Sequence, residues 1–177
     1  MSSSFEALGG DTVYSGKLVD VRIERFRHAD GAEVTREIVR HRGAVGIVAY
    51  DAEHVWLVRQ PREAVEESAL LEIPAGRLDK DGEQPLAAAQ RELAEEIGRG
   101  ARSWEPIVVY YTGAGFTDER LHLFCARELY EAHADSGEEE RIEIVPWPLG
   151  ELQAAIDECR DAKTLIGLLW LARRLDV

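Results

Sequence analysis

Three carboxylates lie close together in one short stretch of the sequence, at Glu92, Glu95 and Glu96. Their spacing of three and four residues places them on one face of a helix. Like charges at this spacing destabilise a helix slightly unless a partner neutralises them. Clustered carboxylate oxygens suit hard cations such as Mg²⁺, Mn²⁺ or Ca²⁺. The cluster therefore indicates either a solvated helix face or a divalent-metal site, and the spacing alone does not decide between them.

The residues around the glutamates predict an amphipathic helix. Pro85 stands where a proline is tolerated in the first turn, and Gly98 is typical of a helix end. Apolar residues recur with the helical period on a neighbouring face. These are Leu86, Ala89, Leu93 and Ile97. We expect this apolar stripe to face the core and the acidic residues to line one edge.

The sequence that flanks the glutamates resembles the signature of the Nudix hydrolases. That signature is Gly, five residues, Glu, seven residues, then Arg-Glu-aliphatic-any-Glu-Glu-any-Gly-aliphatic. Gly76 opens it here, Glu83 is the isolated glutamate, and seven residues separate Glu83 from Arg91. Two positions depart from it. Six residues separate Gly76 from Glu83, in a loop where an insertion is tolerated, and Arg99 replaces the last aliphatic residue.

Three further stretches resemble the ADP-ribose pyrophosphatases, a subfamily of the Nudix hydrolases. Residues 71–76 have the sequence LEIPAG, and residues 58–62 resemble the VRQxR segment of that subfamily. Residues 111–119 resemble its SPGFTDE loop, except that Ala114 replaces the common proline. The resemblance extends from about Arg36 to the C-terminus.

The resemblance implies hydrolysis of a small nucleoside-diphosphate-linked molecule, with ADP-ribose split into AMP and ribose 5-phosphate as the first expectation. The alternatives are another nucleotide sugar or dinucleotide as substrate, or a non-catalytic nucleotide-binding module. The expected metal ligands are Glu92, Glu95, Glu96 and the backbone of Ala75, with Mg²⁺ as the ion and Mn²⁺ as a substitute. Such ions would neutralise the phosphates and lower the pKa of bound water. Arg91 is expected to brace the carboxylates.

Substrate contacts are expected from residues in and before the subfamily stretches. These are Arg36, Arg59, Arg62, Glu72, Gly115, Phe116 and Asp118. Arg59 and Arg62 precede the metal loop, where guanidinium groups suit bidentate phosphate contacts. Taken alone, each of these residues also has a plain structural explanation, such as a surface charge, a turn or a core position.

A water-activating base is expected outside the acidic helix, because a carboxylate that binds a cation is a poor proton acceptor. In ADP-ribose pyrophosphatases a glutamate from a separate loop is implicated as this base. The corresponding acidic loop contains Glu138, Glu139 and Glu140, of which we place Glu139 slightly behind the other two. A charge run of this kind is most often a solvated loop.

Residues 43–177 are predicted to form the Nudix domain, an α/β/α sandwich with a mixed β-sheet. Residues 43–49 form a continuous apolar run, typical of a central strand buried on both faces. Further strands are predicted at 54–59, 70–73, 107–111, 121–126 and 141–147, and helices at 149–159 and 162–175.

Residues 1–42 are predicted to form a small, separate β region. Strands are expected between Val13 and Val39, with a break near Gly16 and a hairpin turn at residues 28–31. Apolar residues here are too few to bury one another, so the region should pack on the main domain or on a second subunit. The resemblance implies a homodimer whose N-terminal strands complete the partner's substrate site.

Composition limits the classes of partner. The 177 residues have a net charge of −13, which argues against nonspecific binding to nucleic acid or to an anionic membrane surface. We see no membrane-spanning apolar stretch and no signal peptide. Cys125 and Cys159 lack metal-ligand spacing and are expected to remain reduced. We therefore expect a cytoplasmic protein.

Overall fold

The computed structural model describes residues 4–132 and 141–177, which divide into two compact units. One unit comprises residues 1–43 and 110–120, and the other comprises residues 44–109 and 121–177. The sequence assigned residues 110–120 to the Nudix domain. In the structure this loop pairs with the N-terminal strands: the Val39 N–H donates to the Phe116 carbonyl at 2.8 Å, and the Asp118 N–H donates to the Val39 carbonyl at 3.3 Å.

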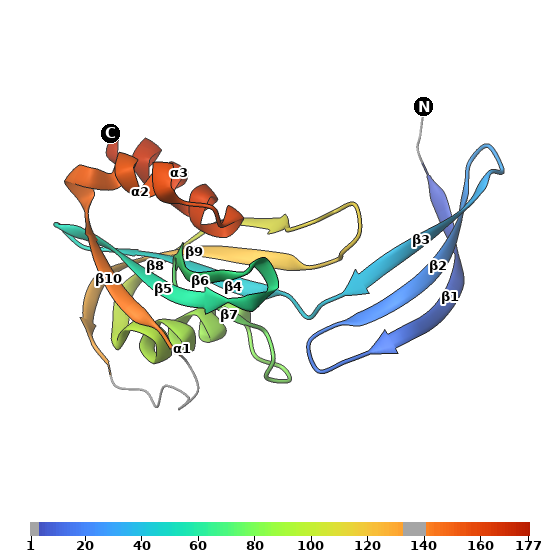
Figure 1. Ribbon diagram of the computed structural model, residues 1–177, viewed down its shortest axis with the longest axis horizontal. Coiled ribbons are helices and arrows are strands. Elements are labelled where there is room, and N and C mark those ends of the chain that lie inside the picture. The colour runs from blue at the N-terminus through green and yellow to red at the C-terminus, as the bar shows by residue number, and fades with distance from the viewer. Residues whose placement is uncertain (1–3, 133–140) are drawn as a thin grey trace. The chain divides into compact units, whose positions relative to one another are not determined.

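The described part of the first unit contains an antiparallel sheet of three strands (Figure 1). They are β1 (Phe5–Ser15), β2 (Asp20–His28) and β3 (Glu33–Arg40). The predicted turn between β2 and β3 is present, with Gly31 at a φ of 86° donating its N–H to the His28 carbonyl. We expected the first strand to begin at Val13, but β1 begins at Phe5. Its early residues are almost all exposed, so no apolar alternation marks them as a strand.

The second unit contains a mixed sheet whose described strands follow the order β10-β5-β4-β9-β8, with β6 paired to β5 and β7 to β4. The strands are β4 (Ala44–Tyr50), β5 (His54–Arg62), β6 (Glu67–Glu72), β7 (Ala75–Arg77), β8 (Arg99–Tyr111), β9 (Arg120–Glu131) and β10 (Glu143–Pro148). β4 runs parallel to β9 and antiparallel to β5. The predicted mixed sheet is confirmed, although β7 and the first half of β8 were not predicted.

Helices cover both faces of this sheet (Figure 1). α1 (Pro85–Ile97) lies on one face, while α2 (Leu152–Glu158) and α3 (Ala162–Leu175) lie on the other. Short 3₁₀ turns at Glu63–Val65 and Leu149–Glu151 precede β6 and α2. The layers are those of the predicted α/β/α sandwich.

α1 has the ends that the sequence predicted. Pro85 lies in its first turn, and Gly98 ends it with a φ of 64° while donating its N–H to the Ala94 carbonyl at 3.1 Å. Such a left-handed residue favours glycine, because a Cβ there is strained. The start and the end of the acidic helix are therefore fixed locally.

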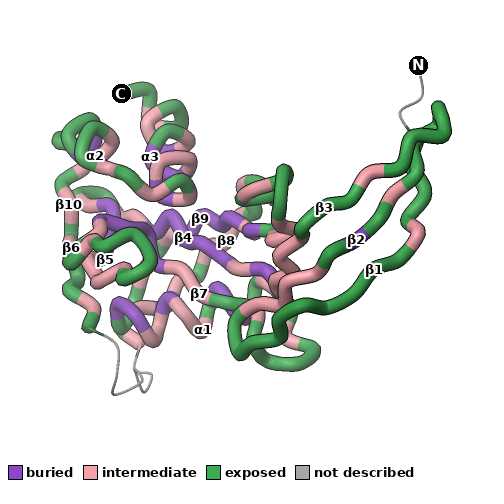
Figure 2. Tube along the Cα trace, turned by 45° about the vertical axis from the view of Figure 1, so that its right-hand side comes forward, coloured by how far each residue is buried: buried purple, intermediate pink, exposed green. Residues whose placement is uncertain are grey.

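α1 packs on the sheet through the apolar stripe. Its side chains join strand residues in one buried cluster. The members are Val45, Ile47, Ala49, Val58, Ala88, Ala89, Leu93, Ile97, Phe124 and Ala126. Figure 2 colours the buried residues of α1 and of the strands purple. The prediction that Leu86 belongs to this core is wrong, since it is 40% exposed. Leu86 occupies the first turn of α1, beyond the part that packs on the cluster, and Ala88 is buried instead.

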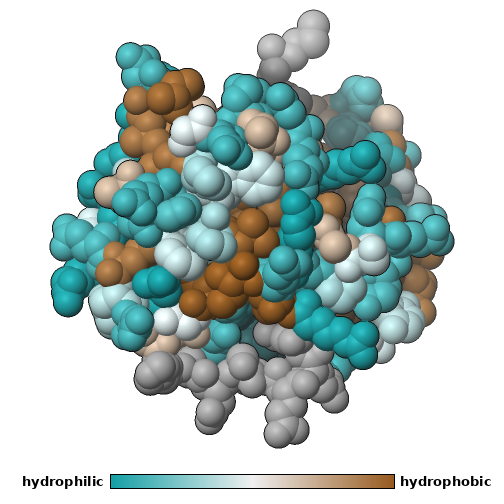
Figure 3. Space-filling view, turned by 60° about the vertical axis from the view of Figure 1, so that its left-hand side comes forward, coloured by the Kyte–Doolittle hydropathy of each residue, from teal (hydrophilic) through white to brown (hydrophobic). Residues whose placement is uncertain are grey.

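The surface is mixed, with hydrophobic patches set among hydrophilic side chains on the face that Figure 3 shows. In the part of the chain that the structure describes, no helix is long and apolar enough to cross a membrane. Cys125 is buried and Cys159 is partly buried, and both are free thiols. Burial raises the pKa of Cys125 to about 11.

Candidate active site

Arg91 lies at the centre of the acidic face of α1. Its Nη1 donates to Glu92 Oε1 at 2.7 Å and to Glu95 Oε2 at 2.8 Å. Its Nε and Nη2 donate to the two carboxylate oxygens of Glu83 at 3.1 and 3.0 Å. One guanidinium group therefore joins three carboxylates. These hydrogen bonds, above all those to Glu83, outweigh burial and raise the pKa of Arg91. The hydrogen bonds from Arg91 in turn lower the pKa of Glu83.

The expected bracing contact between Arg91 and Glu95 is present. The bidentate pairing with Glu83 was not predicted, because it joins α1 to the loop before it rather than two residues one turn apart. This pairing gives the isolated glutamate of the signature a local role in holding Arg91.

Gly76 lets the loop before α1 approach the acidic face. A Cβ at this position would lie 1.8 Å from Cδ of Glu92, so a side chain there would displace the Glu92 carboxylate. β7 holds the loop in this place by pairing Gly76 with Val45 of β4. The glycine that opens the signature therefore allows a close approach of backbone to carboxylate.

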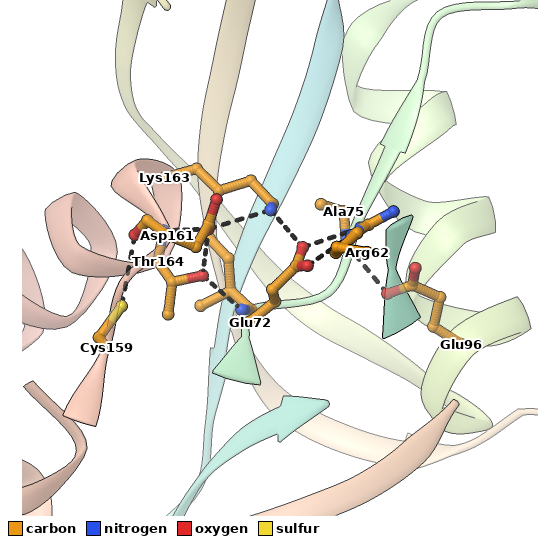
Figure 4. Close-up of polar contacts among 9 residues, drawn as sticks. Arg62, Glu72, Ala75, Glu96, Cys159, Asp161, Lys163 and Thr164 are labelled. Atoms are coloured by element: carbon orange, nitrogen blue, oxygen red, sulfur yellow. Dashed lines mark hydrogen bonds and ion pairs between the residues drawn. The ribbon is translucent and has the colours of Figure 1, made fainter. Parts of the chain in front are cut away.

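Glu96 connects α1 to the same loop. It is 8% exposed, and its Oε2 accepts a hydrogen bond from the Ala75 N–H at 3.0 Å (Figure 4). The structure thus brings together two members of the predicted metal-ligand set that are well separated in the sequence. Glu92 and Glu95, the other two, meet at the same nitrogen of Arg91.

The donor atoms here fit a divalent cation by type, because carboxylate and carbonyl oxygens are hard ligands. Among residues 4–132 and 141–177, no three His, Cys, Asp or Glu side chains form a cluster that could hold a metal ion. The carboxylates of α1 are bonded to Arg91 or to Ala75. Because they form no such cluster, binding a cation through all three glutamates requires their side chains to move.

Glu72 is a second acidic centre, fully buried at the end of β6. Its oxygens accept hydrogen bonds from Arg62 Nε at 2.5 Å and Arg62 Nη2 at 2.8 Å, and Lys163 Nζ also donates to it (Figure 4). Burial disfavours the ionised carboxyl, but the hydrogen bonds and charges of Arg62 and Lys163 outweigh it and lower the pKa of Glu72. Glu72 is therefore a buried anion held between two cations.

The predicted substrate residues of β5 and β6 have protein partners. Arg62 binds Glu72, while Arg59 Nη2 donates to Glu158 Oε1 of α2 at 2.5 Å. The two guanidinium groups thus have separate acidic partners. The side chain of Arg62 is 41% exposed and remains accessible to a ligand, whereas Glu72 has no exposed surface. Direct substrate contacts from these three residues stay predictions.

The GFTDE loop is anchored within the first unit. Asp118 Oδ2 accepts from Arg40 Nη1 at 2.9 Å, and Asp118 Oδ1 accepts from the His41 N–H at 3.0 Å. Arg40 Nη2 also donates to the buried Glu24 at 2.7 Å. Burial opposes ionisation of Asp118, but the bonds from Arg40 and His41 lower its pKa. Asp118 therefore fixes the loop to the end of β3.

The remaining candidates stay predictions. Phe116 is 60% exposed, Gly115 has open space where a Cβ would stand, and Arg36 donates Nη1 to the neighbouring Thr35 carbonyl. The acidic candidates for the base lie outside the described residues, which end at 132 and resume at 141. They are Glu138, Glu139 and Glu140.

Sequence reasoning missed the part that α3 plays beside Glu72. No signature marks Lys163 or Thr164, and their partners lie 91 residues away along the chain. Only Asp161 had a local indication, because an aspartate just before a helix is typical of an N-cap. Its Oδ2 accepts from the Thr164 N–H at 3.0 Å.

The family model of the NUDIX domain matches residues 40–165. The chain belongs to the Nudix family. An ADP-ribose pyrophosphatase of Bacillus subtilis (strain 168) is 36% identical over 171 residues, covering 94% of this chain and 91% of that protein. A methanol dehydrogenase activator of Bacillus methanolicus is 36% identical over 166 residues, covering 91% and 89%.

A solved structure has the same fold. The crystal structure of an ADP compounds hydrolase has a TM-score of 0.86 and 24% sequence identity, and the match covers 98% of this chain and 95% of that chain. The prediction of a Nudix hydrolase with an α/β/α fold is therefore confirmed, and so is the prediction that the chain is an enzyme. Nudix hydrolases generally use a divalent metal ion. The substrate of this chain is a small molecule.

We expect Glu72→Gln to destabilise this Nudix chain in a pH-dependent way. The change removes the buried anion that Arg62 and Lys163 share and should lower the free energy of unfolding at pH 7 by about 3 kcal/mol, the lower end for breaking a buried ion pair. The pKa of Glu72 is lowered below its ordinary value of 4.5, so its stabilising effect is complete above that value. It is lost as the pH falls through the lowered pKa.

Urea unfolding from pH 7 to pH 3 measures the effect. The difference between variant and wild type should be largest at pH 7 and should shrink below about pH 4.5. Glu67→Gln is the matched control, on the same strand and in an exposed pair with Arg160, and should cost less than about 1 kcal/mol. A difference that stays constant over this range would contradict the assignment of Glu72 as a buried anion.

Proposed function

We propose that this chain hydrolyses ADP-ribose to AMP and ribose 5-phosphate in the presence of Mg²⁺, with Mn²⁺ as a substitute. The main support is the acidic face of α1, where Arg91 gathers the carboxylates of the Nudix signature beside the loop of Ala75 and Gly76. A relative that is 36% identical over 94% of this chain is an ADP-ribose pyrophosphatase.

The chemistry follows from charge. A diphosphate diester is doubly anionic, so an anionic nucleophile and the acidic helix both repel it. Glu92, Glu95, Glu96 and the Ala75 carbonyl would hold the cation. When bound, the cation supplies charge neutralisation at the diphosphate and a lower pKa for coordinated water. Arg91 orients the carboxylates, and activity should therefore depend strictly on metal.

Two alternatives differ in their observable products. A Nudix enzyme for another nucleotide sugar or dinucleotide would release a different nucleotide, and Ala114 in the GFTDE loop bears on that choice. A non-catalytic nucleotide-binding module would release none, but it has no need of all three glutamates. A screen of nucleoside-diphosphate compounds with Mg²⁺, with AMP as the readout, separates the three possibilities.

The proposal places the enzyme in the cytoplasm. Both cysteines are free, as they are in reducing compartments. The net charge of −13 disfavours nucleic acid and anionic membranes as partners.

We expect Glu95→Gln and Glu96→Gln each to lower kcat for ADP-ribose by at least about 100-fold at ordinary Mg²⁺ concentration. Each change removes one anionic ligand without creating a cavity. Even mutation of a residue that only supports a metal ligand typically lowers metal affinity or activity by about 10–100-fold. Glu53→Gln in the exposed β4–β5 turn is the matched control and should leave kcat unchanged. Near-wild-type turnover in both variants would refute the metal-site assignment.

The water-activating base is proposed to be Glu138 or Glu140, with Glu139 as the third candidate. The carboxylates of α1 are occupied as ligands on this proposal, so a separate proton acceptor is needed. Changing the base to Gln should lower kcat by about 10²–10⁴-fold, with metal affinity nearly unchanged. Kinetics and Mn²⁺ titration of the three single variants test this. If kcat falls only a few-fold in all three variants, the base lies elsewhere, and Glu119 or a glutamate of α1 is the next candidate.

A homodimer is proposed, in which the N-terminal strands complete the partner's substrate site. Apolar side chains on and beside these strands are strongly exposed. They include Phe5, Val13, Tyr14 and Leu18. Burying such surface in a second subunit would stabilise both copies. Light scattering at micromolar concentration should give the mass of a dimer, and a fully active monomer would overturn the proposal.

A further inference from the structure

The segment from Glu72 to Gly76 is held from three directions. From β4, the Ile47 N–H donates to the Pro74 carbonyl at 2.8 Å. From α1, Glu96 accepts the Ala75 N–H. From α3, the hydroxyl of Thr164 accepts the Ile73 N–H at 2.8 Å. These contacts fix two peptide groups at the base of the signature loop, the one that joins Glu72 to Ile73 and the one that joins Pro74 to Ala75.

The contact from α3 is completely buried. Thr164 has no exposed surface, and its hydroxyl donates to Asp161 Oδ2 at 2.6 Å while it accepts from Ile73. The carboxylate of Asp161 also caps the helix by accepting the Thr164 N–H. The acceptor role of the hydroxyl toward Ile73 is therefore fixed by the first turn of α3 (Figure 4).

α3 can reach this segment because Gly167 lies one turn beyond Thr164. A Cβ on Gly167 would lie 2.8 Å from Val48 Cγ2 and 3.5 Å from Ile73 Cδ1. The helix therefore packs closely against β4 and against the side chain of Ile73. Two contacts of different kinds, one polar and one steric, join α3 to the same residue.

An ion pair also joins α3 to this segment, at Glu72. Lys163 donates to Glu72 and to Asp161 Oδ2, the latter at 3.0 Å, so one cation joins the cap of α3 to the end of β6. Arg62 holds the other side of Glu72. Glu72 is thus tied to α3 and Ala75 to α1, and a shift of α3 would move Ala75 relative to Glu96.

We propose that the first turn of α3 is a positioning element of the active site, in which Thr164, oriented by Asp161, holds the Ile73 peptide so that Ala75 meets Glu96. Thr164 is a positioning residue and touches no reacting atom. The inference rests on the proposed function for its kinetic consequence only. Its structural part concerns the Ala75 amide in the free protein.

The test compares Thr164→Val, Thr164→Ser and Leu171→Val. Valine removes the hydroxyl and leaves the Ile73 N–H without its acceptor, whereas serine keeps the hydroxyl. Leu171→Val is the matched control, because Leu171 is a fully buried residue two turns farther along α3 and its truncation lowers stability by loss of packing. Asp161→Ala is a milder second variant, which removes the acceptor that orients the hydroxyl.

Amide hydrogen exchange of the metal-free protein gives the first readout. Thr164→Val should speed exchange of the Ala75 amide about tenfold, because a buried donor left without its acceptor makes local opening of the segment easier. Asp161→Ala should change it in the same direction by less. Thr164→Ser should match the wild type, and Leu171→Val should lower Tm without a selective effect at Ala75.

Kinetics with ADP-ribose give the second readout. Thr164→Val should lower kcat about tenfold with KM within about twofold, and serine should restore it. If Thr164→Val behaves like Leu171→Val in both readouts, α3 acts only on stability and the proposal is wrong. If the wild type does not hydrolyse ADP-ribose, the proposed function fails, while the exchange at Ala75 still decides the positioning role.

Discussion

The electrostatic repulsion among the glutamates of α1 is the constraint on which the site depends. Three carboxylates on one helix face are unfavourable by themselves. Arg91 resolves this within the same helix, because one planar guanidinium group offers several donors in a fixed arrangement. It binds Glu92 and Glu95 and reaches back to Glu83. The acidic face is therefore ordered before a metal or a substrate adds any charge.

The loop beside this face is under a different constraint, which is steric. Glu92 lies so close to Gly76 that a Cβ there would displace its carboxylate. The backbone of this loop has several contacts of its own. It is held by β4, by Glu96 and by the buried network around Glu72, in which a fully buried anion is balanced by Arg62 and Lys163. One acidic centre thus provides the candidate ligands, and the other fixes the backbone that lies against them.

The sequence predicted the features whose causes are local. α1 was predicted with both ends, because its proline, its apolar period and its terminal glycine all lie within the helix or beside it. β4 was predicted from its apolar run. Features that depend on distant partners were missed. β7 has three residues and exists only by pairing with β4, and β1 is recognisable only through its register with β2.

The same distinction applies to the site. Arg91 and Glu95 lie one turn apart on α1, and their contact follows from helix geometry. The role of Thr164 follows from no local pattern, since its partner Ile73 is 91 residues away. Leu86 shows the opposite error. Its spacing fits the apolar stripe, but spacing gives only the face of a helix and not the length over which that face is covered.

The two units divide the expected site residues between them. The signature residues lie in the second unit, and on the proposed function they act on the diphosphate, which every candidate substrate contains. They cannot distinguish one nucleotide from another. Arg36 and the GFTDE loop belong to the first unit, where Asp118 is fixed by Arg40 and His41. Ala114, the departure from the ADP-ribose subfamily, also lies there. On the proposed function, these candidate substrate contacts take their positions from β3, while the carboxylates that would hold the cation take theirs from α1.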